Sequence, residues 1–153
     1  MKKLAELLKS KGVGPQGSKS LSQDELIGLT DTMLSDAESM ITKATLLTAF
    51  LLLENTPEET SWLNDFSQIE TLPVELYQLL PTSFKSLTAS KKMHFALSMH
   101  HKIINKKDLS SKETSKLVKY WLSPQSDTTI VASTLEGLRL KRETFSENLE
   151  IWK

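Results

Sequence analysis

The sequence contains no cysteine, which excludes disulfides, thiolate metal ligands and thiol catalysis. Its five glycines include no run of the kind that holds phosphates against backbone amides. Aromatic residues make up only 7% of the chain, so a broad stacking surface for single-stranded nucleic acid is not expected. The main apolar run, 44–53, is too short to cross a bilayer, and the start of the chain lacks the apolar region of a secretory signal. These features predict a cytoplasmic protein without membrane association.

The chain has 153 residues, of which 39% are hydrophobic and 25% charged, as in ordinary globular proteins. This length predicts a single domain over 1–153 that is large enough to bury a core. The formal net charge of zero conceals a strong asymmetry. Residues 21–75 contain eleven acidic side chains against Lys43 alone, whereas residues 85–119 contain nine lysines against two acidic residues. Such asymmetry indicates either a surface for an acidic partner or two halves that attract each other.

Helix signals recur along the whole chain, and no segment alternates apolar and polar residues long enough to predict a strand. The apolar run from Ala44 is followed by Thr56-Pro57-Glu58-Glu59, a cap that opens a second helix after a tight corner. Similar signals occur elsewhere, and the sequence therefore predicts an all-α fold. The predicted capping boxes are Ser22 to Glu25, Thr56 to Glu59, Ser110 to Glu113 and Thr144 to Glu147, with Asp127 as a further N-cap.

An internal repeat organises these helices. A shift of 88 residues aligns Leu21–Leu63 with Leu109–Ile151 without a gap, and eleven of the 43 pairs are identical. About three identities are expected by chance from average residue usage. The alternative is that any two amphipathic helix triplets with capping boxes resemble each other. The identical pairs are Leu21/Leu109, Ser22/Ser110, Glu25/Glu113, Leu29/Leu117, Leu34/Leu122, Ser35/Ser123, Ala44/Ala132, Leu47/Leu135, Leu52/Leu140, Thr56/Thr144 and Glu59/Glu147.

The predicted fold is a helical bundle of about seven to eight helices built from two repeated three-helix units. The units cover about 21–66 and 109–153, and a helical connector over 72–106 joins them. Two units are fewer than an open solenoid requires, so we expect the two copies to pack on each other.

The second unit carries the motif that points to a family. Leu138 to Thr144 reads Leu-Arg-Leu-Lys-Arg-Glu-Thr and is followed by Glu147, while the first copy, Ala49 to Glu59, lacks the Arg-x-Lys element. The segment from Lys11 to Ser22, which precedes the first unit, is similar to the start of the less typical members of the same group. Together these segments resemble the N-terminal helical-bundle domain of the anthranilate phosphoribosyltransferase group (glycosyltransferase family 3), in two copies.

The resemblance implies a role in association, because helices of this domain form the homodimer contact of the family and cover the cleft facing its catalytic domain. The glycine-rich loop and the acidic magnesium-binding pair of that catalytic domain are missing here. We therefore expect no catalytic, cofactor-binding or metal-binding residues in this chain. Phosphoribosyl pyrophosphate and Mg²⁺ are expected only if a C-terminal α/β domain follows.

The leading prediction is thus a non-catalytic helical module for association and domain packing. We expect it either to form a homodimer or to pack against that C-terminal α/β domain. Because the sequence ends inside a predicted helix, we expect either a fragment of a longer transferase-like protein, whose parent would be a phosphoribosyltransferase, or a helix docked at the terminus.

The alternative is a nucleic-acid-binding helical protein that uses a basic face between residues 91 and 119. Lysines there would contact phosphates, although only Phe95 and Tyr120 lie nearby for stacking. The predicted nucleic-acid or phosphate contacts are Lys91, Lys92, Lys102, Lys106, Lys107, Lys116 and Lys119.

Other candidate side chains have simpler interpretations. His94, His100 and His101 share a predicted helix without a carboxylate at ligand spacing, so no metal site is expected. The tryptophans, at positions 62, 121 and 152, are predicted to be core or interface residues. The basic group Arg139, Lys141 and Arg142 is predicted to contact the acidic first unit, in this chain or in a partner.

Overall fold

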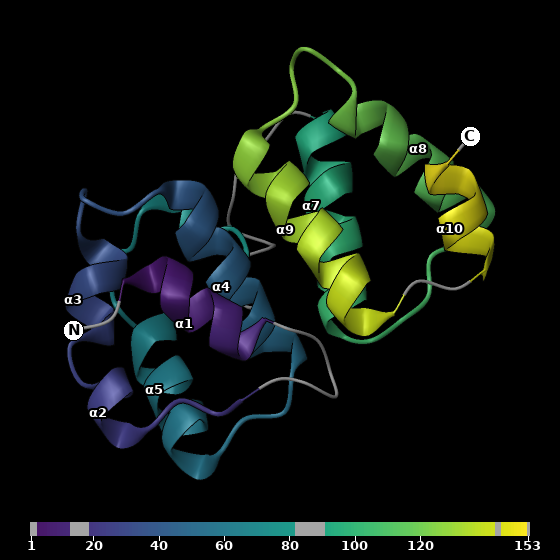
Figure 1. The fold of residues 1–153 in the computed structure, drawn as a ribbon. Coiled ribbons are helices and arrows are strands. Elements are labelled where there is room, and N and C mark those ends of the chain that lie inside the picture. Colours follow the sequence, from purple (N-terminus) through teal and green to yellow (C-terminus); the bar gives the residue numbers. More distant parts are fainter. Residues whose placement is uncertain (1–2, 13–18, 82–90, 143–144, 153) are drawn as a thin grey trace.

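The computed structural model describes residues 3–12, 19–81, 91–142 and 145–152, with the side chains of 91, 92, 145, 146 and 148 left out. All regular secondary structure in these residues is helical, which confirms the predicted all-α fold (Figure 1). No helix within the described ranges is both long enough and apolar enough to span a membrane. The helices are α1 (Leu4–Lys11), α2 (Gln23–Leu26), α3 (Leu29–Leu34), α4 (Met40–Leu52), α5 (Pro57–Ser67), α6 (Val74–Tyr77), α7 (Lys91–Ile104), α8 (Ser111–Trp121), α9 (Thr128–Lys141) and α10 (Phe145–Ile151).

The predicted caps begin the helices that they were expected to begin. Ser22, Thr56 and Ser110 each accept a hydrogen bond from the backbone N–H of the third residue of their helix. The glutamate at that position in turn accepts one from the backbone N–H of the cap residue. Asp127 accepts two backbone hydrogen bonds at the start of α9. The remaining predicted cap, Thr144, lies outside the described residues. These local hydrogen bonds satisfy amides that the first turn of a helix leaves unpaired.

The segment that follows the Ser22 cap, up to Leu34, forms two short helices rather than one. Gly28 separates α2 from α3 with φ 77° and ψ −3°, in the left-handed region. A residue in this conformation cannot continue a right-handed helix, and glycine adopts it without a steric penalty. The chain therefore turns at this point and α3 begins in a new direction.

The two middle helices, α4 and α9, lie side by side at the centre of the molecule (Figure 1). They correspond to each other under the 88-residue shift. Gly137 allows the close approach, because a Cβ at this position would lie 2.8 Å from Cγ2 of Ile103 and 3.6 Å from Cγ2 of Thr48. At the equivalent position α4 has Ala49, which is fully buried. Small residues at this crossing therefore bring α4, α7 and α9 together.

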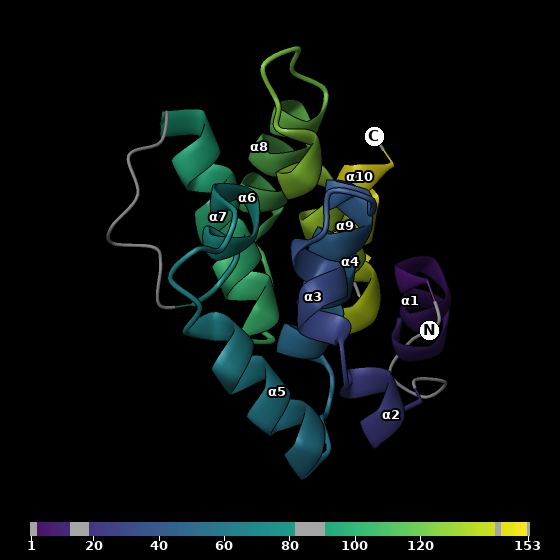
Figure 2. The same ribbon diagram turned by 90° about the vertical axis from the view of Figure 1, so that its left-hand side faces the viewer.

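Each unit contains one helix more than the sequence indicated. The shift aligns α1 with residues 92–99, which lie in α7. Helix α1 packs on α4, and α7 packs on α9 in the same way. The predicted connector thus contributes α7 to the core of the second unit, while the short helix α6 packs on α4. Figure 2 shows α4 and α9 enclosed between these outer helices.

The same buried hydrogen bond closes both units. Leu21 donates its backbone N–H to Oε1 of Glu59 at 2.7 Å, and Leu109 donates to Oε1 of Glu147, also at 2.7 Å. Both carboxylates are fully buried. Each therefore joins the start of the first helical segment of its unit to the start of the last one.

The cation that neutralises each buried carboxylate comes from a different place in the two units. Lys11 at the end of α1 is fully buried and lies 2.9 Å from Oε2 of Glu59. In the second unit, Lys141 at the end of α9 lies 3.0 Å from Glu147 and also 3.0 Å from exposed Asp108. The two units thus use one design with different charge partners.

Candidate functional site

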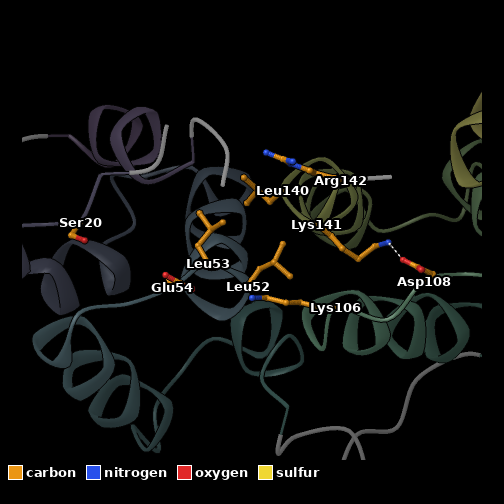
Figure 3. A pocket seen from close by; sticks show the side chains of 9 residues that line it. All are labelled: Ser20, Leu52, Leu53, Glu54, Lys106, Asp108, Leu140, Lys141 and Arg142. Atoms are coloured by element: carbon orange, nitrogen blue, oxygen red, sulfur yellow. Dashed lines mark hydrogen bonds and ion pairs between the residues drawn. The ribbon is translucent and has the colours of Figure 1, made fainter. Parts of the chain in front are cut away.

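A pocket of about 500 Å³ lies where the carboxyl ends of α4 and α9 meet, and we call it the junction pocket (Figure 3). Its volume is within the range of small-molecule sites. Leucines form its apolar wall, and charged side chains from both units surround them. The lining residues are Ser20, Leu52, Leu53, Glu54, Lys106, Asp108, Leu140, Lys141 and Arg142.

Eight of these nine residues form four pairs that the 88-residue shift makes equivalent. The leucines at positions 52 and 140 are the identical pair. The other pairs differ in chemistry, and in each of them the second unit contributes the charged or basic member. They are Ser20/Asp108, Leu53/Lys141 and Glu54/Arg142.

The charged side chains that line the junction pocket differ in whether they already have a polar partner. Lys141 Nζ turns away from the α4 end to bind Asp108 and Glu147 (Figure 3). Lys106 and Arg142 extend across the pocket toward α4, and neither side chain has a polar partner among the described residues. The predicted contact of Lys141 with the acidic first unit is therefore wrong. Its carboxylate partners belong to the second unit, because α9 ends beside the start of α8.

Backbone conformation also marks two of these residues. Among the described residues, Lys106 (φ 59°) and Arg142 (φ 68°) are the non-glycine residues with positive φ. Lys106 follows α7 in a Schellman arrangement, in which its N–H donates to the Ile103 carbonyl and the Lys107 N–H donates to the Lys102 carbonyl. Glycine is the usual residue at this position, so a lysine here is held at a conformational cost.

The other lysines predicted as phosphate contacts differ in their surroundings. Lys102 donates to both oxygens of Glu113 at 3.0 and 2.8 Å, and this contact, with the Ser110 amide, lowers the pKa of the Glu113 carboxyl. Lys107 is exposed. The side chains of Lys91 and Lys92 lie outside the described part of the chain.

A second pocket, of about 280 Å³, collects the rest of the basic stretch between α7 and α8. Lys116, Lys119 and Tyr120 line it together with Phe95 and Ser123. The Lys116 ammonium lies 4.1 Å from the centre of the Phe95 ring, at cation–π distance. Of the two aromatic residues that the sequence placed near the lysines, Phe95 contacts Lys116 and Tyr120 lines the same pocket.

The histidines lie apart from both pockets. His100 is fully buried, and its Nε2 lies 3.1 Å from the Thr48 hydroxyl. Burial, aided by neighbouring His101, lowers the pKa of His100 from 6.5 to about 3. Burial also lowers the pKa of His101, and a hydrogen bond to the Gln78 carbonyl opposes this effect. No group of three potential metal ligands occurs in the described residues.

An exposed apolar pair lies at the carboxyl end of α10, a helix at the outer side of the second unit and away from α4 (Figure 1). Leu149 is 49% exposed and Trp152 is 84% exposed. Leu149 lies in the last turn of α10, and Trp152 directly follows the last residue of the helix. The equivalent positions in the first unit hold Ser61 and Asn64, both exposed. By contrast, Trp62 and Trp121 are partly buried and donate to threonine hydroxyls.

Sequence reasoning missed the junction pocket because its residues are distant in the chain. The signal that would have found it is the repeat, since the 88-residue shift pairs the positions that converge there. Of the lining residues, the sequence predicted Lys106 as a nucleic-acid or phosphate contact, and Lys141 and Arg142 as contacts of the acidic first unit.

No protein-family model, curated protein or solved structure matches this chain. The resemblance to glycosyltransferase family 3 therefore stays a prediction, as does every activity that it implies.

Proposed function

We propose that this chain is a non-catalytic helical module that works by association, and that its partner is a second copy of itself. The observation that carries the proposal is the exposed pair Leu149 and Trp152 at the carboxyl end of α10. The first unit folds with Ser61 and Asn64 at the same positions, so apolar side chains are not required there for the fold. Exposed aromatic and aliphatic residues that lie close together are typical of association surfaces.

The internal repeat favours a second copy of the chain as the partner that covers this exposed surface. The chain already joins two like units through equivalent helices, α4 and α9. Two α10 helices related by a twofold axis would bring the same residues of each copy together, as an isologous dimer requires. A domain that follows α10 in a longer protein, as the family resemblance implies, is the other arrangement to be distinguished.

Several carboxylates among the described residues are bound by partners inside the fold, and this supports a non-catalytic role. Glu59 and Glu147 accept backbone hydrogen bonds inside the fold. Glu113 binds Lys102, and Asp108 binds Lys141. These groups hold helices together, which supports a binding role for the chain.

The residues of the first unit provide the test. We expect the double variant Leu149→Ser and Trp152→Asn to convert a dimer into a monomer while the far-UV circular dichroism stays unchanged. Light scattering coupled to size-exclusion chromatography measures the mass. Leu122→Ser is the control, because Leu122 is 81% exposed but lies at the other end of α8 from the contact with α10. A wild-type chain that stays monomeric at high micromolar concentration, or a dimer that survives the double variant, would contradict the proposal.

A second candidate function is nucleic-acid binding through the α7–α8 surface. The observation that favours it is the pocket in which Lys116 and Lys119 lie beside Phe95 and Tyr120. Charge reversal at Lys116 and Lys119 is expected to abolish any binding of a single-stranded oligonucleotide, and wild-type affinity should fall steeply with salt. Fluorescence anisotropy at two salt concentrations measures both effects. Binding that is insensitive to salt, or unchanged by the reversal, would eliminate this candidate.

A further inference from the structure

We propose that the junction pocket binds a small organic anion with an apolar body. The acidic head, a phosphate or a carboxylate, lies between Lys106 and Arg142, and the body rests on Leu52, Leu53 and Leu140. This site is separate from α10, so it does not depend on the association proposed above.

The balance of unpaired charge in the pocket favours an anionic head. Asp108 is bound by Lys141, which leaves Glu54 as the one lining carboxylate without a polar partner among the described residues. Two cations without a polar partner among the described residues, Lys106 and Arg142, line the same pocket, so unpaired positive charge exceeds unpaired negative charge. A guanidinium and an ammonium on opposite sides of an opening suit the oxygens of a phosphate or carboxylate, which accept charge-assisted hydrogen bonds.

Donors already bind two carbonyl groups at and just past the end of α4, which reduces the negative charge that this helix end presents to the pocket. A helix presents partial negative charge at its carboxyl end, which disfavours a nearby anion. Here the Glu54 carbonyl accepts a hydrogen bond from Lys11 Nζ at 3.1 Å, and the Phe50 carbonyl accepts one from Asn55 Nδ2 at 2.7 Å. One carbonyl in the last turn of α4 and one just past the end of the helix are therefore paired with donors, and the donor of the second is a cation.

The repeat shows which part of the pocket differs between the units. Leu52 and Leu140 are the same in both, as expected for an apolar base where two like helices meet. The rim changes from Glu54 in the first unit to Arg142 in the second. Contact between the units accounts for the leucines, but it does not account for two unpaired cations on the second side.

Backbone strain at both cations points in the same direction. Positive φ costs free energy for any residue with a Cβ, and such residues gather at functional sites. Lys106 and Arg142 both pay this cost and both line the same pocket. Glycine would relieve the strain at either position, so the side chains, rather than the backbone, are what these positions retain.

Nuclear magnetic resonance titration tests the site, with phenyl phosphate, phenylacetate and inorganic phosphate as probes. We expect at least one of the two aromatic probes to shift the amide signals of Leu52, Leu53 and Leu140, and these two arms show whether the head is a phosphate or a carboxylate. Inorganic phosphate should bind more weakly than phenyl phosphate, because it lacks the apolar body.

The matched variants are Lys106→Gly and Arg142→Gly. Each is expected to weaken binding about tenfold or more by removing a charge-assisted contact, while the melting temperature rises as strain is relieved. Lys107→Gln, next to Lys106 but outside the pocket, should leave binding unchanged. Binding that survives both glycine variants would overturn the proposal, as would the lack of any shift from either aromatic probe up to roughly 10 mM. Equal affinity for inorganic and phenyl phosphate would overturn the apolar part of it.

Discussion

Replacing Glu59 by methionine is expected to lower the free energy of unfolding by about 3–5 kcal/mol, the cost of breaking a buried ion pair. Lys11 would lose its charged partner at a fully buried position, where the Glu54 carbonyl and the Phe50 ring, 5.2 Å away, are its remaining contacts among the described residues. The backbone amides of Leu21 and Thr56 would also lose their acceptor. Urea denaturation at neutral pH, monitored by circular dichroism, measures the change.

The second unit supplies the matched control. Glu147→Met removes the equivalent carboxylate, but Lys141 retains Asp108 at 3.0 Å, and Asp108 is largely exposed to solvent. The loss of stability should therefore be smaller than for Glu59→Met. Equal losses in the two variants would show that the hydrogen bond to the leucine amide, and not the stranded lysine, dominates the cost.

Lys11→Met completes the comparison in the first unit. Glu59 would still accept hydrogen bonds from two backbone amides, so this variant should lose less stability than Glu59→Met. Combining the two substitutions removes both charges, and the double variant is expected to be more stable than Glu59→Met alone. A double variant as unstable as the sum of both single ones would contradict a direct coupling between the two side chains.

Acidification from pH 7 to pH 5 is expected to destabilise the protein by about 2 kcal/mol through His100 alone. The unfolded chain binds a proton at His100 near the ordinary pKa of 6.5, whereas burial in the folded state lowers this pKa to about 3. Between these values the unfolded state binds more protons, so stability falls as the pH falls. The full effect is present above pH 6.5 and is lost progressively toward pH 3.

The variant His100→Gln isolates this contribution, because glutamine can still bond to the Thr48 hydroxyl but does not titrate. We expect its stability to change less between pH 7 and pH 5 than that of the wild type. Urea denaturation at both pH values gives the difference, from which effects of exposed carboxylates cancel. An unchanged pH dependence in the variant would mean that His100 is accessible to protons in the folded state.

The features that the sequence predicted correctly are those that depend on neighbours in the chain. The boxes at Ser22, Thr56 and Ser110 join residues three positions apart, and the period of the apolar residues assigned the helices. Gly28 is the local exception, because a glycine is compatible with a helix until the packing of α3 requires a turn there. The sequence likewise predicts Trp152 as either a core or an interface residue, because its exposure depends on how the last helix packs.

The interactions that the sequence did not predict join distant residues. Lys11 lies 48 positions from Glu59, and Leu109 lies 38 positions from Glu147. The prediction that the basic residues at the end of α9 reach the acidic first unit failed for Lys141, because nearer carboxylates in its own unit compete for it. Counting charges along the chain cannot resolve such a competition, since it depends on which helix ends are adjacent.

The sequence by itself determined that this chain is helical, where its capped helices begin, and that two of its segments share one pattern. Only the tertiary structure decided that α4 and α9 end at the same pocket, that α7 completes the second unit, and that Leu149 and Trp152 face solvent. The physical reason is that helix formation and capping are governed by contacts within one or two turns. Pockets and exposed faces depend on how side chains interlock between helices, which small residues such as Gly137 settle at a single crossing.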